Sequence, residues 1–365
     1  MGLKCGIIGI TNIGKTTLFN CFSESRVATS NFAFSANKSN LGQVKVPDER
    51  LLNIDRNIRS AKVVPTTVDI VDIPGLTHGS SKGEGVGNSF LADIRNCDAL
   101  IHVVRCFEDL NVPHIDQTID PVRDKETIDL ELQIKDLESI EKRINKLEKT
   151  AKSGDKAAKH DLDLAMGLKA HLENFRNIRS LTLSSEERNL IADLFLLTEK
   201  PVIYVCNVDD ASATSGNRYS EQLKASVADE NTEVMVVAAR LESEIAELES
   251  QDDRLEFLQD VGLDEPGVNR LIRSAYDMLN LQTFFTAGPK EVRAWTIKKG
   301  MTAPEAAGVI HSDLQRGFIR SEVMKYNDFI SLGSEQACKE AGKLFIEGKN
   351  YVVEDGDILH IRFNV

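Results

Sequence analysis

Strand-like and polar stretches alternate along the first third of the chain. Strand-like runs occur at 3–10, 42–46, 67–72 and 99–104. Short runs of this kind, separated by polar or helix-like segments, are typical of a parallel sheet whose strands are joined by crossovers. The pattern resumes at 201–210 and 233–239. We therefore predict one mostly parallel sheet of the α/β class that is interrupted between these two parts.

The interruption, residues 124–199, is highly charged and has a helical pattern. Apolar residues recur in two series: Ile134, Leu137, Ile140, Ile144 and Leu147, then Leu162, Met166, Leu168, Leu172 and Phe175. The first series has the spacing of a coiled-coil seam, and the break at 153–155 predicts a reversal of direction. We expect an antiparallel helical hairpin that projects as an arm, because its charged faces are wide. An ordinary amphipathic pair packed on the core is the alternative.

A third pattern begins at about residue 281. Short strand-like runs surround one helical segment at 303–310, and Asp355-Gly356 predicts a tight turn near the end. This arrangement is typical of a small α+β module. The predicted organisation is an α/β domain in two parts, 1–123 and 200–280, with a helical insertion at 124–199 and a C-terminal module at 281–365.

The charge balance limits the possible partners. The 365-residue chain is longer than most single domains and carries a net charge of −13. This charge argues against a protein that coats nucleic acid by charge alone, so RNA binding would need a local basic face. The C-terminal module has four basic residues that could line one of its faces, Lys298, Lys299, Arg316 and Arg320, although scattered surface charge is the simpler interpretation. We expect no sequence-specific binding of DNA.

The six cysteines form no C-x-x-C pair, and Cys5, Cys106 and Cys206 lie in or beside apolar runs. This pattern is typical of reduced, buried thiols rather than of a disulfide framework or a zinc site. No apolar run approaches the length of a membrane-spanning helix. We expect a cytoplasmic protein without membrane association.

The first strand-like run leads into Gly9-Ile10-Thr11-Asn12-Ile13-Gly14-Lys15-Thr16, a G-x-x-x-x-G-K-T sequence that precedes a helical segment. In this setting the backbone N–H groups and the helix N-terminus converge on the phosphates of a nucleotide. Lys15 is predicted to bridge the β- and γ-phosphates, and the Thr16 hydroxyl to bind Mg²⁺. The predicted nucleotide contacts in this loop are Gly9, Asn12, Ile13, Gly14, Lys15, Thr16 and Thr17.

A second motif, Asp72-Ile73-Pro74-Gly75, ends the run at 67–72. In P-loop NTPases an aspartate at this place holds Mg²⁺, and the glycine N–H can contact the γ-phosphate. We therefore predict Thr16 and Asp72 as metal ligands and Gly75 as a nucleotide contact. The polar loop 30–40 and the glycine-rich segment 78–88 are expected to respond to the γ-phosphate as switches.

The order of these parts closely resembles the YchF family, the Obg-like ATPases related to translation factors. The resemblance spans essentially the whole chain and is carried by residues 9–16, 72–75, 81–88, 102–107, 239–248, 279–295 and 317–319. It implies a P-loop NTPase G domain, a helical coiled-coil insertion and a C-terminal TGS domain of the β-grasp type. It also implies an ATPase that binds the ribosome and its rRNA.

The base-reading motif differs from that of guanine-binding relatives, which have N-K-x-D after a buried strand. This chain has Asn207-Val208-Asp209-Asp210 there. The YchF family has N-x-x-E, in which the glutamate does not suit the paired N–H donors of guanine. By this resemblance Asn207, Val208 and Asp210 form the base site. The missing lysine favours ATP, whereas Asp210, the residue type of guanine readers, keeps GTP as an alternative.

Two positions bear on hydrolysis. Ala36 stands where the family has a threonine that reaches Mg²⁺, and Leu76 stands where Ras-like GTPases have a water-orienting glutamine. The resemblance implies that a histidine on a mobile loop replaces this glutamine; His114 fits by position, and His78 is a weaker candidate. We therefore predict Lys15 and His114 as catalytic residues of a slow ATPase that a partner accelerates. A GTP-preferring hydrolase and a nucleotide-gated ribosome- or RNA-binding module with negligible hydrolysis stay open.

Overall fold

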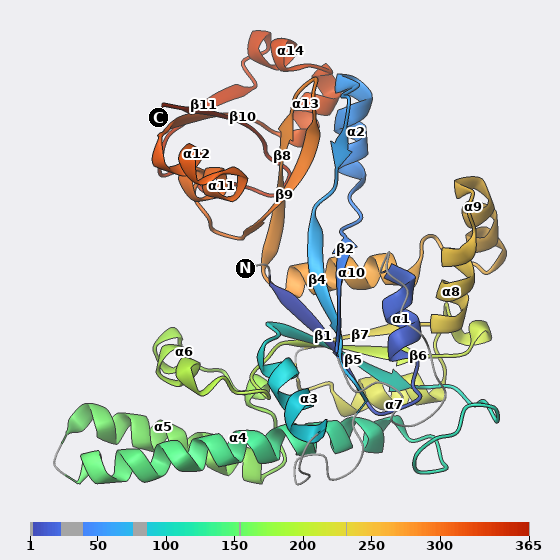
Figure 1. The fold of residues 1–365 in the computed structure, drawn as a ribbon, viewed down its shortest axis with the longest axis vertical. Coiled ribbons are helices and arrows are strands. Elements are labelled where there is room, and N and C mark those ends of the chain that lie inside the picture. The colour runs from blue at the N-terminus through green and yellow to red at the C-terminus, as the bar shows by residue number, and fades with distance from the viewer. Residues whose placement is uncertain (1–2, 23–38, 76–85, 153–154, 231, 365) are drawn as a thin grey trace. The chain divides into compact units, whose positions relative to one another are not determined.

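The computed structural model describes residues 3–22, 39–75, 86–152, 155–230 and 232–364 (Figure 1). Most of the two expected switch segments, 30–40 and 78–88, lies outside these ranges, as do Ala36, Leu76 and His78. The chain forms two compact units: Met1–Gln43 with Asp69–Leu271, and Val44–Val68 with Ile272–Val365. Along the described part of the chain, no helix is both long and apolar enough to span a membrane.

The sheet of the first unit has the strand order β2-β4-β1-β5-β6-β7. Its strands are β1 (Lys4–Ile8), β2 (Asn40–Lys45), β4 (Thr67–Asp72), β5 (Ala99–Arg105), β6 (Val202–Asn207) and β7 (Glu233–Val237). β1 pairs in parallel with β4 and β5, and β5, β6 and β7 follow in parallel. Every residue of β5 and β6 is buried, as expected for strands covered on both faces. The predicted mostly parallel sheet is confirmed.

Helices lie between these strands and after the last of them. α1 (Lys15–Phe22), α3 (Val86–Arg95) and α7 (Arg218–Ser226) lie between strands of the sheet, whereas α8 (Ala239–Glu247), α9 (Gln251–Asp260) and α10 (Gly267–Met278) follow β7. In an open parallel sheet, ligands bind in the crevice outside the carboxyl ends of the strands. The loops after β1, β4, β5 and β6 converge at this edge, which therefore carries the candidate site.

The interruption between β5 and β6 is the predicted helical hairpin (Figure 1). α4 (Pro121–Ala151) and α5 (Lys156–Glu173) lie side by side and are in extensive contact. The contact is apolar, and its buried members are Ile140, Ala165, Leu168 and Leu172. The chain returns to the sheet through η1 (Ile178–Ser180), α6 (Ser185–Ile191) and η2 (Ala192–Leu194).

The predicted apolar series of α5 is wrong at two positions. Met166 is 55% exposed and Phe175 is 76% exposed. Ala165, the neighbour of Met166, occupies the helix contact instead. α5 ends at Glu173, and Phe175 has a left-handed φ of 56°. Its side chain therefore no longer follows the apolar face of the helix.

Buried polar groups hold the root of the arm. Asp136 of α4 is fully buried, and its carboxylate accepts hydrogen bonds from the N–H groups of Leu197 and Thr198, each at 2.8 Å. The Thr198 hydroxyl donates a third hydrogen bond at 2.7 Å. Burial raises the pKa of Asp136, and these hydrogen bonds oppose the rise. The carboxylate thus ties α4 to the segment that leads into β6.

A second buried cluster joins the arm to β6. Lys125 and Arg179 each contact both Asp129 and Glu230. The N–O distances from Lys125 are 3.0 Å to Asp129 and 2.5 Å to Glu230, and those from Arg179 are 3.1 Å and 3.3 Å. Glu230 also accepts a hydrogen bond from the hydroxyl of Tyr204 in β6 at 3.0 Å. Each buried charge has opposite charges beside it, which offsets the cost of its desolvation.

The second unit contains the C-terminal module. Its sheet has the order β11-β10-β12-β8-β9-β3. The strands are β3 (Val63–Val64), β8 (Leu281–Ala287), β9 (Val292–Lys298), β10 (Phe318–Met324), β11 (Leu344–Glu347) and β12 (Ile358–Phe363). The helices are α2 (Glu49–Ile58), α11 (Ala303–Ile310), α12 (Ser312–Arg316), α13 (Tyr326–Leu332) and α14 (Glu335–Glu340). The predicted small α+β architecture is confirmed.

Residues 44–68 pack into this second unit, although the sequence pattern places them in the first domain. Leu51 and Ile54 of α2 are buried together with Phe285, and β3 pairs in parallel with β9. The periodicity of a short amphipathic helix shows which face is buried but not which distant residues cover it. The predicted domain boundaries at 123, 199 and 280 stay predictions.

We expect Asp136→Ala to lower the free energy of unfolding by roughly 2–4 kcal/mol, because buried N–H and hydroxyl donors would lose their acceptor. Urea-induced unfolding followed by circular dichroism measures this change. Glu138→Ala is the control on the same helix, since Glu138 is 43% exposed and pairs with Lys135. It should change the stability by less than about 0.5 kcal/mol. Equal effects of both substitutions would contradict the anchoring role of Asp136.

Candidate nucleotide-binding site

The loop after β1 has the conformation that its glycines predict. Gly9 and Gly14 have φ values of 144° and 92°, a region that L side chains rarely adopt. Space is equally restrictive. A Cβ atom on Gly9 would lie 2.5 Å from the carbonyl oxygen of Val103, and one on Gly14 would lie 2.5 Å from Nδ2 of Asn207. α1 begins directly after this loop, so the positive end of its dipole is at the loop.

The ammonium group of Lys15 is buried inside the loop. Nζ donates hydrogen bonds to the carbonyl oxygens of Gly9 at 3.1 Å and Ile10 at 2.5 Å, and the residue is 7% exposed. Burial lowers the pKa of Lys15 to about 8, although the negative charge of Asp72 opposes the shift. A phosphate group would give this buried cation stronger acceptors and a compensating negative charge.

Thr16 and Asp72 meet although they are far apart in the sequence. Oγ1 of Thr16 donates a hydrogen bond to Oδ2 of Asp72 at 2.9 Å. They meet because β1 and β4 are parallel neighbours, with Ile7 beside Asp72. Burial raises the pKa of Asp72, while the hydrogen bond from Thr16 and the charge of Lys15 oppose the rise. The second carboxylate oxygen, Oδ1, is buried and accepts no hydrogen bond from the described residues.

These two side chains fit a magnesium site. Mg²⁺ prefers oxygen ligands and is commonly bound through one or two protein groups together with water and substrate phosphates. Oγ1 of Thr16 and the unpartnered Oδ1 of Asp72 are oxygen ligand atoms of this kind. The residues present could therefore hold Mg²⁺, and their role as ligands stays a prediction.

Gly75 lies directly against the same loop. A Cβ atom at this position would lie 2.9 Å from Nζ of Lys15 and 2.8 Å from Cγ2 of Thr11. A residue larger than glycine would have to displace the loop or the lysine. The structure thus brings Gly75 together with the predicted phosphate contacts. Two other predicted contacts, Asn12 and Thr17, are half-buried at the same place.

Asn207, at the end of β6, connects this loop to α8. Its Nδ2 donates a hydrogen bond to the carbonyl oxygen of Ile13 at 2.8 Å, and its Oδ1 accepts one from the N–H of Ala239 at 2.9 Å. The residue is 4% exposed. Both ends of the carboxamide are therefore used inside the protein, and the side chain holds the two segments together.

The other two predicted base contacts have different environments. The side chain of Val208 is buried in the core, so only its backbone can contact a nucleotide. Asp210 begins η3 (Asp210–Ser212), and its side chain is 42% exposed. Its Oδ2 lies 3.8 Å from Nε of Arg240. The carboxylate expected to read the base thus faces a positive charge.

A buried arginine that the motifs do not single out shapes the loop after β5. Arg105 is 2% exposed and donates hydrogen bonds to the carbonyl oxygens of Phe107 at 3.1 Å, Asp109 at 3.2 Å and Val112 at 2.9 Å. Burial lowers its pKa, and nearby carboxylates oppose the shift. A single arginine at the end of an apolar strand was the sequence signal for this role.

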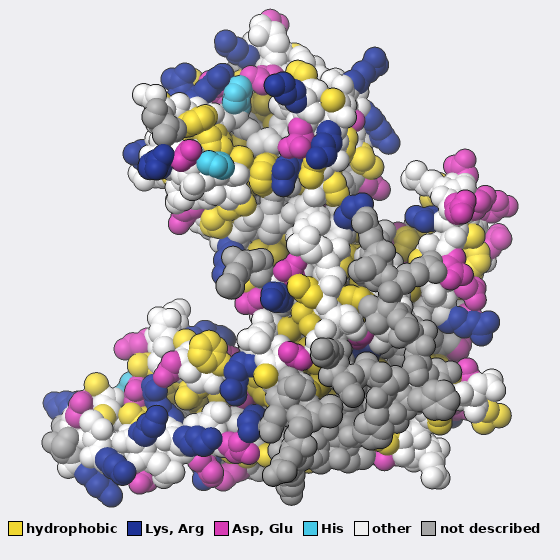
Figure 2. Space-filling view, in the orientation of Figure 1, with side chains coloured by type: hydrophobic (Ala, Val, Ile, Leu, Met, Phe, Trp, Pro, Cys, Tyr) yellow, Lys and Arg dark blue, Asp and Glu magenta, His cyan; other side chains and the backbone are white. Residues whose placement is uncertain are grey.

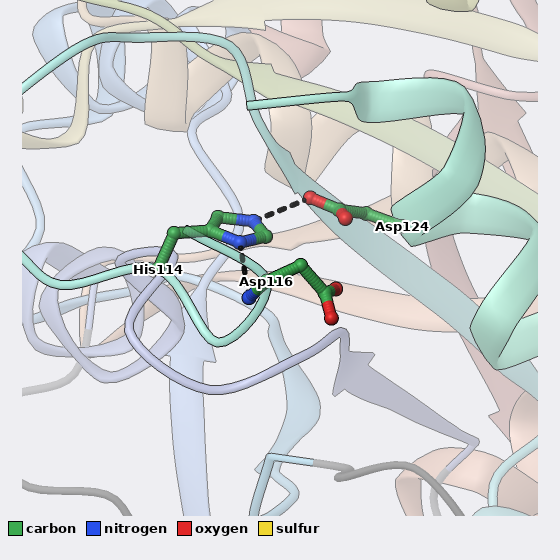
Figure 3. Close-up of side chains that lie close together, drawn as sticks. All are labelled: His114, Asp116 and Asp124. Carbon is green, nitrogen blue, oxygen red and sulfur yellow. Dashed lines mark hydrogen bonds and ion pairs between the residues drawn. The ribbon is translucent and has the colours of Figure 1, made fainter. Parts of the chain in front are cut away.

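His114 lies in the same loop, beside the phosphate-binding loop, where Nδ2 of Asn12 donates a hydrogen bond to the carbonyl oxygen of Pro113 at 3.3 Å. The ring is held from both sides (Figure 3): Nδ1 accepts from the N–H of Asp116 at 3.0 Å, and Nε2 lies 2.8 Å from Oδ2 of Asp124. Because Nδ1 accepts, Nε2 carries the proton and donates it to Asp124. The side chain is 3% exposed. In this conformation neither ring nitrogen is available to a water molecule.

The groups around His114 are close enough to suggest a metal site. The ligand atoms of His114, Asp116 and Asp124 lie within 4.8 Å of one another. Arg123, however, contacts Asp116 at 3.5 Å and Asp124 at 2.9 Å. Its charge already compensates the carboxylates and would repel a cation. The cluster is therefore an ion-pair network that fixes the loop to the start of α4.

A parallel sheet, a G-x-x-x-x-G-K-T loop at the carboxyl end of β1 and the Thr16–Asp72 pair define a P-loop nucleoside triphosphatase. Known families match both parts of the chain. A family model described as "50S ribosome-binding GTPase" matches residues 4–152. The model for the C-terminal domain of YchF GTPases, described as a protein of unknown function (DUF933), matches residues 281–364.

The chain belongs to the YchF family. It is 48% identical to the ribosome-binding ATPase YchF of Haemophilus influenzae and 47% identical to that of Bacillus subtilis, with 100% of both chains covered in each comparison. The solved structure of the Schizosaccharomyces pombe YchF GTPase has a TM-score of 0.87 and 34% identity, covering 99% of this chain and 98% of that chain. The predicted family, the P-loop domain and the small C-terminal β domain are confirmed.

The lowered pKa of Lys15 predicts that nucleotide binding takes up a proton at alkaline pH. Above about pH 8 the free protein has largely lost this proton, whereas bound phosphates raise the pKa and restore it. Affinity should therefore fall as the pH rises above about 8, by up to about tenfold per unit. Calorimetric titration with a nucleoside diphosphate at pH 9, in buffers of different ionisation enthalpy, measures the uptake.

We expect an uptake close to one proton at pH 9 and a small value at pH 7. The pH 7 titration is the internal control, because Lys15 is then mostly protonated before binding. Absence of uptake at pH 9 would show that Lys15 does not meet the phosphates.

Proposed function

We propose that this protein binds ATP with Mg²⁺, hydrolyses it slowly, and binds the ribosome and its rRNA in a nucleotide-dependent manner. The buried Lys15 beside the Thr16–Asp72 pair carries the proposal. A desolvated cation fits a polyphosphate, and the neighbouring oxygen atoms fit its Mg²⁺. The names of the relatives from H. influenzae and B. subtilis, ribosome-binding ATPases, support the same activity. Such a protein would act in the cytoplasm.

The phosphates are bound by the loop after β1 and by the end of the β4 motif. The residues assigned to this role are Gly9, Asn12, Ile13, Gly14, Lys15, Thr16, Thr17 and Gly75. The backbone N–H groups and the Lys15 ammonium group offset the charge of the β- and γ-phosphates. Mg²⁺ held by Thr16 and Asp72 supplies further charge neutralisation when it is bound. Positioning and charge compensation are the main requirements of phosphoryl transfer.

The contacts of the base-reading motif favour ATP. Asn207 uses its carboxamide inside the protein, Val208 offers only its backbone, and the carboxylate of Asp210 faces Arg240. A carboxylate that faces a guanidinium group is less available to the two N–H donors of guanine. GTP is the second candidate, because Asp210 is partly exposed and the S. pombe relative is named a GTPase.

Competition between ATP and GTP analogues for the purified protein, with Mg²⁺ at one salt concentration, tests the base preference. We expect the ATP analogue to bind at least about tenfold more tightly, a difference of about 1.4 kcal/mol. Tighter binding of the GTP analogue would make this protein a GTPase. Binding of neither analogue would overturn the assignment of the site.

Phosphate release by the same preparation, with and without ribosomes, separates an ATPase from a module with negligible turnover. We expect slow release that ribosomes accelerate. Tight nucleotide binding without release, even with ribosomes present, would instead support the nucleotide-gated binding module.

His114 is proposed to orient the attacking water. The contact between Asn12 and Pro113 supports this role, since it keeps the histidine loop beside the phosphate-binding loop. Nε2 is hydrogen-bonded to Asp124, so the ring must first break this hydrogen bond before it can contact a water molecule. Catalysis therefore requires a second conformation of the loop, and slow turnover without a partner follows from this requirement.

We expect His114→Ala to lower the ribosome-stimulated kcat by about 100-fold or more. The affinity for ATP should stay within about twofold, because the ring contacts Asp124 and the backbone of Asp116 rather than the phosphate-binding loop. Single-turnover hydrolysis and equilibrium binding measure the two quantities. Asp116→Asn is the control, since it keeps the N–H that bonds His114. Unchanged turnover in His114→Ala would leave this residue as an anchor of the loop only.

A further inference from the structure

The end of the arm formed by α4 and α5 is basic, although the chain as a whole is acidic. The whole chain has 44 Lys and Arg against 57 Asp and Glu, whereas residues 142–160 have seven against two. Six of the seven are exposed lysines, here called the tip lysines: Lys142, Lys146, Lys149, Lys152, Lys156 and Lys159. Figure 2 shows Lys and Arg side chains gathered along this arm.

The tip lysines on α4 share one face of the helix. Lys142, Lys146 and Lys149 are separated by four and three residues, a spacing that places side chains on one side. The apolar contact with α5 uses other positions, such as Ile140 and Ile144. The lysines therefore project away from the seam that holds the hairpin together.

The tip lysines have no carboxylate partner within the described part of the chain. Other basic residues of the arm are paired. Lys169 contacts Glu141 at 2.8 Å, and Arg143, the seventh basic residue of the segment, contacts Asp193 at 2.8 Å. The end of the arm thus presents lysines that form no ion pair with the residues that the structure describes.

The basic residues of the C-terminal module do not form a comparable surface. Three of the four that the sequence singles out are paired: Lys299 with Asp277 at 3.3 Å, Arg316 with Asp313 at 2.8 Å and Arg320 with Glu322 at 3.9 Å. They are surface charges with local partners, as expected from the sequence. The unpaired tip lysines are therefore the better candidate for contact with a polyanion.

Distance from the acidic body preserves the charge of the tip. Asp136 marks the packed root of α4, and Lys149 lies about 20 Å further along the helix at 1.5 Å per residue. The Debye length at physiological ionic strength is about 8 Å. The negative charge at the root of the arm is largely screened over this distance, so it does not prevent a polyanion from approaching the tip.

The chemistry of the tip fits nucleic-acid phosphates better than a protein or a membrane. Protein interfaces are depleted in lysine and depend on apolar or aromatic anchors, and interfacial helices insert apolar side chains into a membrane. Among the described residues of 142–160, no large apolar side chain is exposed. Lysines alone bind a polyanion by releasing its counterions.

We propose that the tip lysines dock the arm on the phosphate backbone of an RNA segment of the ribosome. This contact rests on the proposed ribosome binding and specifies the surface and the chemistry that achieve it. Because lysine meets phosphate as a point charge, the contact depends on the charge of the RNA rather than on its sequence.

The test compares the full-length protein with the variant Lys142→Glu/Lys146→Glu/Lys149→Glu. Lysine and glutamate have similar helix propensities, so α4 should persist. One probe is purified ribosomes, in co-sedimentation with the ATP analogue bound. The other is a fluorescein-labelled RNA hairpin of arbitrary sequence, titrated at several salt concentrations. We expect both affinities to fall at least about tenfold and the salt slope for the hairpin to become shallower by about 2 to 3.

The matched control is Lys224→Glu/Lys339→Glu/Lys349→Glu, which changes the net charge equally at exposed lysines outside the arm. It should bind both probes within about twofold of the unchanged protein. The affinity for the ATP analogue is measured for both variants and should not change, since all six positions lie outside the nucleotide site.

Three outcomes would contradict these proposals in different ways. If the tip variant binds both probes as the control does, the docking proposal is wrong and ribosome binding stands. If it loses ribosomes but keeps the hairpin affinity and salt slope, the tip contacts a ribosomal protein, which overturns the assignment to RNA. If the unchanged protein never co-sediments with ribosomes, the proposed function fails, and the hairpin titration still decides whether the tip binds RNA.

Discussion

A buried positive charge, the ammonium group of Lys15, is the constraint on which the nucleotide site depends. Burying an ammonium ion is costly unless it is hydrogen-bonded and compensated. The loop after β1 therefore turns its own carbonyl oxygens inward, and Asp72 supplies a negative charge nearby. Gly9 and Gly75 must be glycine, because a Cβ atom on Gly9 would lie 2.5 Å from the carbonyl oxygen of Val103 and one on Gly75 would lie 2.9 Å from Nζ of Lys15. Much of the cost of placing the cation is thus met by folding, before any nucleotide arrives.

The parts of the site that the sequence predicts are contiguous motifs and the ends of neighbouring strands. Asp72 reaches Thr16 because parallel strands bring their carboxyl ends together. The pocket of His114 and the role of Arg105 could not be predicted, since both depend on the path of a loop without periodicity. The family resemblance pointed to His114 as a loop histidine, but only the structure shows that both ring nitrogens are engaged. The packing of 44–68 was hidden for a related reason, because its partners are distant in the sequence.

The contacts of α4 change in character along the helix. Buried charges around Asp129 and the carboxylate of Asp136 hold its root, and apolar contact with α5 holds its middle. Its end carries solvent-exposed lysines. Polar contacts with defined geometry restrict the angle of a helix more than apolar contacts do, so the root fixes the direction of the arm. The cluster at the root includes Tyr204, three residues before Asn207 on β6. The arm is therefore attached to the same strand that carries the base-reading motif.

The position of α2 within the chain also affects how the protein is made. Residues 44–68 leave the ribosome early, yet the partners that bury Leu51 and Ile54, such as Phe285 and Phe329, are synthesised more than 200 residues later. At ~5–20 residues per second this delay is roughly 10–60 s. During this interval the neighbouring strands β2 and β4 can already join the first sheet while α2 between them stays uncovered. The second unit is thus completed only at the end of synthesis, and a chain that stops near residue 280 would keep an amphipathic helix whose apolar face, with Leu51 and Ile54, has no partner from the second unit.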